Sequence, residues 1–216
     1  MLSLSGQAAM IWTAMALLGG GLLVWAWIVA RRMVRASQGT PVPPRAGAAL
    51  LLIELQDCLW SDTQHDAATR ARVEAAVARE VELARQRDQP VIALRQEWHG
   101  LMARLIVRLT RPGAPTRGSA DVELAPAFRG MADHVIVKPV EDGFETGALD
   151  ALLDMLRVGR LRLVGREGCA GLARTAQGAL NRGYEVELVR DGIAATDSAA
   201  LDAVLEALTS QGARVV

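Results

Sequence analysis

The sequence predicts an α/β fold, a doubly wound and mostly parallel sheet of about six strands with helices on both faces, preceded by one transmembrane helix. Two observations predict it. Short apolar runs alternate with longer stretches whose apolar residues recur at helical spacing, the pattern of repeated βαβ units. Before them, residues 8–30 form a predominantly apolar run without a charged residue, which is long enough to cross the roughly 30 Å hydrocarbon core of a bilayer.

Residues 1–35 are therefore expected to form a membrane anchor. Trp12 lies near one end of the apolar run, and Trp25 and Trp27 lie near the other, where indole rings favour the headgroup interface. No lysine or arginine precedes the run and arginines follow it directly, so we expect a single-pass protein of the inner or cell membrane with a cytoplasmic C-terminal domain. A cleaved signal peptide is disfavoured, because no basic segment precedes the run and no small-residue cleavage site follows it.

A short linker and one domain are expected after the anchor. Residues 36–47 are rich in proline, glycine and small polar residues, which is typical of a linker, and residues 48–216 are expected to form the α/β domain. The expected strands cover 48–55, 91–95, 134–138, 160–165, 184–190 and 213–216, and the expected helices cover 66–87, 147–157, 170–182 and 197–209.

A further amphipathic helix is expected at residues 101–111. Leu101 and Leu105 fall on one helical face, and Arg104 and Arg108 fall on another. We expect this helix to cover the ligand crevice or an oligomer interface. The alternative is a position on anionic lipid, because interfacial helices show the same division into apolar and arginine faces.

Composition and charge exclude several classes of function. The chain carries 24 basic and 24 acidic residues and no basic block, so nucleic acid is not an expected partner. Its two cysteines, Cys58 and Cys169, are too few for a disulfide framework or a zinc site and favour a reducing compartment. No cofactor or metal is expected. The expected partners are the lipid bilayer through residues 8–30, a membrane protein complex and further copies of the chain in a homo-oligomer.

Polar residues stand where several of the expected strands end. Ligands of a doubly wound sheet bind beyond the carboxyl ends of its strands, and Glu54, Gln96 and Lys138 end the first, second and third strands. Lys138 is the only lysine of the chain, and an ammonium shifts its pKa readily when buried. An acid, an amide and this lysine form a candidate general acid/base site. Alternatively such residues cap helices, which is the favoured interpretation of Gln96 taken alone.

Three segments carry a resemblance to a known family. They read LLIELQDCL, ELAPAFRGMADHVIVKPVEDGF and LRLVGREGCAGLARTAQGALNRGYEVELVRDG, and in order and spacing they are similar to segments of the isochorismatase-like hydrolases, which include nicotinamidases and other cysteine hydrolases. The resemblance covers residues 48–216. It implies a catalytic acid at Glu54, where the family carries aspartate, and a catalytic lysine at Lys138.

Other positions depart from the cysteine hydrolases. Gly171 falls where they carry the nucleophile, and Gly168 falls where they usually carry threonine. Isochorismatases also have glycine at the first position, since vinyl-ether hydrolysis proceeds by protonation and water attack, and Gln96 matches a glutamine that they carry. The resemblance is therefore to the isochorismatase branch. Cys169 is a candidate displaced nucleophile, because a strand-to-helix turn exposes N–H groups that lower a thiol pKa, although burial as a small apolar side chain is favoured.

Two functions remain open at this point. The departures at Glu54, Gly168 and Gly171, together with the anchor, slightly favour a non-catalytic member that serves as a binding or assembly module of a membrane complex. The alternative is an active hydrolase of the isochorismatase type, with Glu54 as proton donor and Lys138 as its electrostatic partner on a small anionic metabolite. The hydrolase predicts a closed, largely apolar pocket around both residues, and the module predicts a filled or open crevice.

Overall fold

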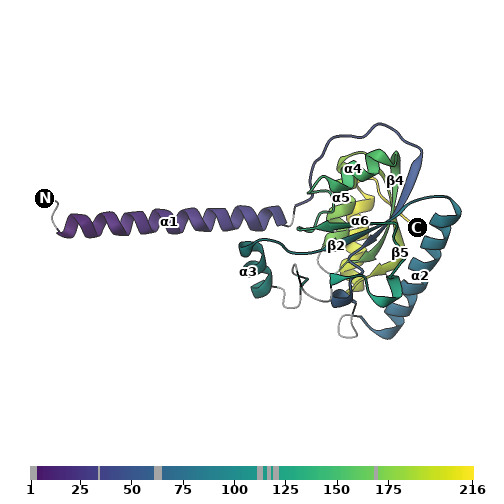
Figure 1. Cartoon of the computed structure of the whole chain (residues 1–216), viewed down its shortest axis with the longest axis horizontal. Helices are drawn as coiled ribbons and strands as arrows, with labels where there is room; N and C mark the ends of the chain where they lie inside the picture. Colours follow the sequence, from purple (N-terminus) through teal and green to yellow (C-terminus); the bar gives the residue numbers. More distant parts are fainter. Residues whose placement is uncertain are drawn as a thin grey trace.

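A computed structural model describes residues 4–33, 35–60, 65–110, 114–115, 118, 122–167 and 170–216 (Figure 1). Six parallel strands form one sheet in the order β3-β2-β1-β4-β5-β6. The strands are β1 (Gly47–Ile53), β2 (Val91–Gln96), β3 (His134–Lys138), β4 (Val158–Arg166), β5 (Glu185–Ala194) and β6 (Arg214–Val215). The predicted parallel sheet of about six strands is confirmed.

The strand order reverses between β1 and β4, which are direct neighbours. The helices are α2 (Ala67–Gln86), α3 (Leu101–Thr110), α4 (Ala148–Met155), α5 (Gly171–Asn181) and α6 (Ser198–Thr209), with short 3-10 turns at Asp57–Leu59 and Pro126–Phe128. The crevice at such a reversal, beyond the carboxyl ends of the strands, is where ligands bind to this class of sheet.

The core consists of two layers, one on each face of the sheet. Successive residues of a strand point to opposite faces, and β1 follows this alternation. Leu50 and Leu52 pack in the cluster that includes Val73 and Val77 of α2. Leu51 belongs to the other cluster, with side chains from α4, α5 and α6. Because both faces of β1 are buried, its sequence is a continuous apolar run rather than an alternating one.

A single apolar helix, α1 (Leu4–Met33), projects from this domain (Figure 1). The predicted N-terminal helix therefore forms, but its expected role as a transmembrane span is not supported. Within the described residues, no helix combines the length and the apolar character needed to cross a membrane. The middle of α1 is Gly19–Gly21, and glycine contributes no apolar side-chain surface to transfer from water into hydrocarbon.

The segment between α1 and β1 has no regular structure, yet it is fixed to the domain. The Ser37 amide donates to Asp142 Oδ2 at 2.6 Å, and the Val42 amide donates to the carbonyl of Arg182 at 2.8 Å. Arg182 in turn donates to the Ser37 hydroxyl at 2.9 Å and forms an ion pair with Asp150 at 2.7 Å. These contacts fix the segment that follows α1 to Asp142 and to the C-terminal end of α5.

Candidate functional site

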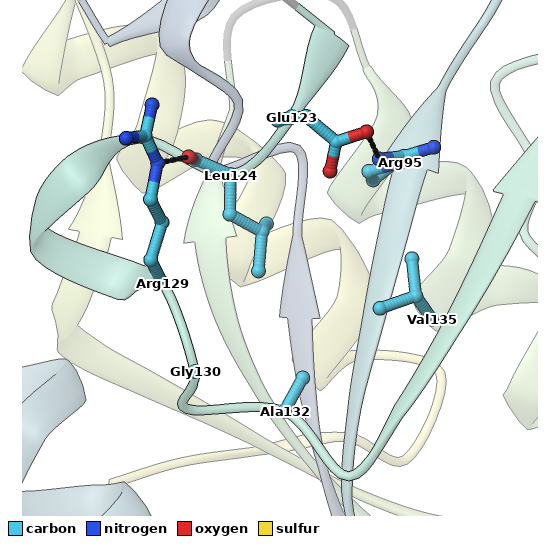
Figure 2. Close-up of a pocket in the computed structure, with 7 residues that line it drawn as sticks. All are labelled: Arg95, Glu123, Leu124, Arg129, Gly130, Ala132 and Val135. Carbon is cyan, nitrogen blue, oxygen red and sulfur yellow. Dashed lines mark hydrogen bonds and ion pairs between the residues drawn. The ribbon is translucent and has the colours of Figure 1, made fainter.

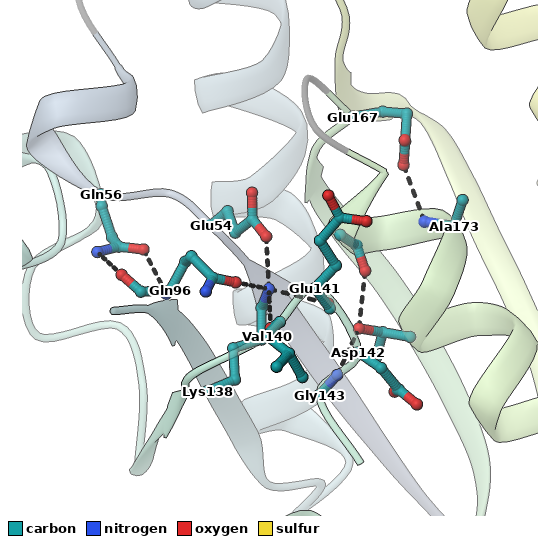
Figure 3. A network of polar contacts seen from close by, with 12 residues as sticks. Glu54, Gln56, Gln96, Lys138, Val140, Glu141, Asp142, Gly143, Glu167 and Ala173 are labelled. Atoms are coloured by element: carbon teal, nitrogen blue, oxygen red, sulfur yellow. Dashed lines mark hydrogen bonds and ion pairs between the residues drawn. The ribbon is translucent and has the colours of Figure 1, made fainter. Parts of the chain in front are cut away.

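Lys138 is the centre of a buried polar network at the carboxyl edge of the sheet (Figure 3). It is the last residue of β3, and its side chain is fully buried. The ammonium donates to Glu54 Oε1 at 2.5 Å, to Gln96 Oε1 at 2.6 Å and to the carbonyl of Glu141 at 2.9 Å. A buried charge is tolerated only when it is paired and hydrogen-bonded, and these partners meet that condition.

Glu54 reaches Lys138 from a strained position. It follows β1 directly, where its φ of 55° lies in the left-handed region, which costs a residue other than glycine about 1–3 kcal/mol. Its amide still donates to the carbonyl of Leu94 at 3.0 Å, so the pairing of β1 with β2 continues into the turn. Its carboxylate is 2 % exposed. Strain of this kind concentrates at functional sites.

The carboxylate of Glu54 occupies the space beside Gly171, the first residue of α5. A Cβ atom at position 171 would lie 2.0 Å from Glu54 Oε1 and 3.2 Å from Lys138 Nζ. The position to which the resemblance assigns the nucleophile of the cysteine hydrolases is therefore filled, in this chain, by the carboxylate of the residue that follows β1. The longer acid at residue 54 and the glycine at residue 171 are two parts of one packing arrangement.

Gln96 is the last residue of β2. Lys138 holds its side chain, and Gln56 holds its backbone. The Gln96 amide donates to Gln56 Oε1 at 2.6 Å, and Gln56 Nε2 donates back to the Gln96 carbonyl at 3.0 Å. The second polar atom of the Gln96 side chain, Nε2, is buried and has no hydrogen-bond partner among the described residues. An amide donor beside a buried ammonium suits an anionic or carbonyl oxygen of a ligand.

Glu167 follows β4 and adds a carboxyl group to the same edge. The pKa of this carboxyl is raised to about 7, chiefly by burial. The nearby charges of Glu54 and Glu141 contribute to the rise, and hydrogen bonds from the amides of Ala173 and Ala170 oppose it. The Ala173 amide lies 2.9 Å from Glu167 Oε2. Near neutral pH this group therefore exchanges a proton readily, which is what a general acid or base requires.

The structure brings together most of the predicted site residues. Lys138 contacts both Glu54 and Gln96, and Gly171 lies beside Glu54 and Lys138. Cys169 and Gly168 lie outside the described residues. The strand-end rule also nominates Gln56 and residues 165–171, which include Glu167. From the sequence Gln56 is interpreted as a structural residue, and no role is assigned to Glu167.

Neither of the two cavities described in the structure lies around Glu54 and Lys138, where the hydrolase predicts a pocket. One cavity, of about 330 Å³, opens beside Arg95 and Val135, whose strands lie at the β3 edge of the sheet (Figure 2). Its lining shares no residue with the Lys138 network, and Arg95 is neutralised there by ion pairs with Glu97 and Glu123. Within the described residues, no group of three or more His, Cys, Asp or Glu side chains is placed to hold a metal ion.

Comparison with known proteins places this geometry in a family. The model of the isochorismatase domain matches residues 48–216. Streptothricin hydrolase from Streptomyces noursei is 34 % identical over 131 residues, which are 53 % of this chain and 47 % of that protein. The chain thus matches less than half the length of this relative.

Solved structures with the same fold include a cysteine hydrolase from Pseudomonas syringae pv. phaseolicola and a pyrazinamidase/nicotinamidase from Streptococcus mutans. The first has a TM-score of 0.68 and 20 % identity, covering 82 % of this chain and 91 % of that one. The second has a TM-score of 0.67 and 19 % identity, covering 79 % of this chain and all of that one. At these identities the likeness supports the fold alone.

Proposed function

The chain belongs to the isochorismatase family, and on that premise we propose that it is a hydrolase that uses Glu54 and Lys138 and no cysteine nucleophile. One observation carries the proposal: the buried ammonium of Lys138 is held at 2.5 Å from the Glu54 carboxylate and at 2.6 Å from the Gln96 amide oxygen. Three neighbouring strands deliver these groups to the edge where ligands bind. Packing alone does not explain why the only lysine of the chain stands at this position.

The arrangement favours direct attack by water over a covalent intermediate. Gly171 offers no nucleophile, and the Glu54 carboxyl lies in the place that such a side chain would fill. The Glu54–Lys138 pair carries one transferable proton: as Glu54 protonates the substrate, the Lys138 ammonium passes its proton to Glu54, which remains a carboxylate beside a neutral amine. Water then adds its hydroxyl to the substrate, the bond to the leaving group breaks, and the proton that water releases returns to the pair. The positive charge of Lys138 and the free amide donor of Gln96 Nε2, which has no partner in the described part of the chain, favour a small anionic substrate.

The test is hydrolysis of a panel of vinyl ethers and small amides by the purified full chain in mild detergent. Glu54→Gln removes the carboxylate through which the proton passes to the substrate and should lower turnover by about 100-fold or more, the usual contribution of general acid catalysis. Glu82→Gln, at an exposed glutamate of α2, is the matched control and should keep full activity. Turnover that survives Glu54→Gln would refute the mechanism.

A second candidate is the non-catalytic binding or assembly module, and one observation favours it. The three N–H groups of Lys138 already face four acceptors, because the carbonyl of Val140 lies at 3.3 Å in addition to the three shorter contacts. An ammonium saturated by side-chain and main-chain oxygens of the protein itself is the filled crevice that this function predicts. It predicts no turnover on any compound of the panel, and migration of the detergent-extracted full chain as a complex with itself or a membrane protein. A monomer that turns over a substrate would exclude it.

We further propose that α1 attaches the domain to a bilayer, with the domain in the cytoplasm. Ten large apolar side chains between Trp12 and Ile28 are exposed on α1, and residues 1–30 carry no charged side chain. Contiguous apolar surface of this extent is rare on soluble monomers and marks a contact with lipid or protein. Resistance of the full chain to extraction by alkaline carbonate supports attachment, and its release into the supernatant refutes it. Protease added to inverted vesicles, but not to intact cells, should digest the domain.

A further inference from the structure

A cavity of about 510 Å³ lies where α1 joins the domain, and its charged residues are all arginines. It is lined by Arg31, Arg35 and Arg174, together with Ala36 and Gln38. Arg31 belongs to the last turns of α1, Arg35 follows that helix, and Arg174 comes from α5 on the domain. We call this the basic cavity. No acidic side chain lines it.

The positive charges of the basic cavity are not neutralised by the protein. Within the described residues, none of its three arginines forms an ion pair. Arg31 lies over the ring of Trp27 at 4.5 Å, and the buried Nε of Arg174 has no hydrogen-bond partner in the described part of the chain. Three guanidinium groups around one cavity repel each other, and a bound anion would relieve that repulsion through charge-assisted hydrogen bonds. Guanidinium groups match the geometry of phosphate oxygens in particular.

The surroundings of the basic cavity indicate where the anion comes from. The cavity adjoins α1, whose apolar side chains are exposed. The helix α3 contacts α1, and it lies beside the domain end of α1 and runs across its direction (Figure 1). Leu101 and Leu109 of α3 are 89 % and 76 % exposed, and Arg104 and Arg108 are exposed on the same helix. An apolar helix with an amphipathic, arginine-bearing helix across its base presents one continuous surface suited to anionic lipid.

We propose that the basic cavity binds the phosphate group of an anionic phospholipid at the membrane surface. The inference rests on the proposed attachment of α1 to a bilayer and adds a defined headgroup site to it. Its consequence for the candidate active site follows from the position of Arg174, three residues after Gly171 in the first turn of α5. A lipid phosphate held by Arg174 fixes the start of the helix against which the Glu54 carboxylate packs.

The test titrates the full chain in a neutral detergent with a short-chain phosphatidylglycerol and follows tryptophan fluorescence, because Arg31 covers the Trp27 ring. We expect saturable binding that Arg174→Gln weakens about fivefold, the attraction that one arginine contributes near an anionic surface. Arg79→Gln, at an exposed arginine of α2, removes the same charge elsewhere and should leave the affinity unchanged. Short-chain phosphatidylcholine, which carries no net charge, should not saturate the site.

Two results would overturn the inference. Equal affinity of phosphatidylglycerol for the wild type and for Arg174→Gln would show that the basic cavity is not the site. Inorganic phosphate that binds as tightly as the lipid and competes with it would show a site for a free anion rather than for a headgroup. Turnover is not measured in this titration, so a failure of the proposed hydrolase and a failure of the lipid site are separate outcomes.

Discussion

Replacing Gly171 by alanine should destabilise the protein, because the new methyl group needs the space that Glu54 fills. The added Cβ would lie 2.0 Å from Glu54 Oε1, so the carboxylate must retreat by roughly 1 Å or more to reach van der Waals separation. That movement stretches its 2.5 Å contact with the buried ammonium of Lys138. Breaking a buried ion pair costs about 3–5 kcal/mol, and alanine regains up to about 1 kcal/mol in a helix. We expect a net loss of about 2–4 kcal/mol.

A double-mutant cycle separates this clash from a general intolerance of alanine in α5. Glu54→Asp withdraws the carboxyl, so in that background Gly171→Ala should cost less than about 1 kcal/mol, a coupling of about 1 kcal/mol or more. Gly178→Ala is the matched control in the same helix, since its Cβ would meet Asp142 and Phe144 and not Glu54. Chemical denaturation of the full chain in detergent measures all variants. An equal cost of Gly171→Ala in both backgrounds would refute the argument that the two residues share one space.

The sheet could be predicted from the sequence because its central strands are buried on both faces. A continuous apolar run bounded by turn residues is expected to form a strand that is buried on both faces of a sheet. The C-terminal limit of β5 was harder to predict, because this strand continues through Arg190 and Asp191 to Ala194. Those charged residues end the apolar run in the sequence, but Ile193 beyond them pairs with Gly165 of β4.

The convergence of Glu54, Gln96 and Lys138 was also predictable, because parallel strands end at one edge. Its finer geometry was not. The contact between Glu54 and Gly171 joins residues 117 positions apart, and no periodicity reports whether a carboxylate fits beside a missing Cβ. The left-handed backbone of Glu54 is equally invisible in the sequence, since glutamate does not favour it. Docking of the segment after α1 depends on backbone groups such as the Ser37 amide, which every residue except proline carries.

Two further substitutions test the electrostatics of the site. Lys138→Met leaves Glu54 buried without its cation and should lower the free energy of unfolding by about 3–5 kcal/mol. Adding Glu54→Met to the same chain should restore most of this loss. A double variant no more stable than Lys138→Met alone would contradict the argument. For Glu167 the pH dependence is the readout. Its folded-state pKa of about 7 exceeds the ordinary value of 4.5, so folding favours the protonated form and the wild type loses stability as pH rises from about 4.5 through 7. The increase in pKa from 4.5 to about 7 corresponds to a loss of about 3 kcal/mol in the free energy of unfolding. Glu167→Gln does not titrate, so denaturation measured between pH 4.5 and 8 should show its stability increasing relative to the wild type by about that amount. A difference that stays constant with pH would mean that the Glu167 carboxylate is as well solvated in the folded protein as in the unfolded chain.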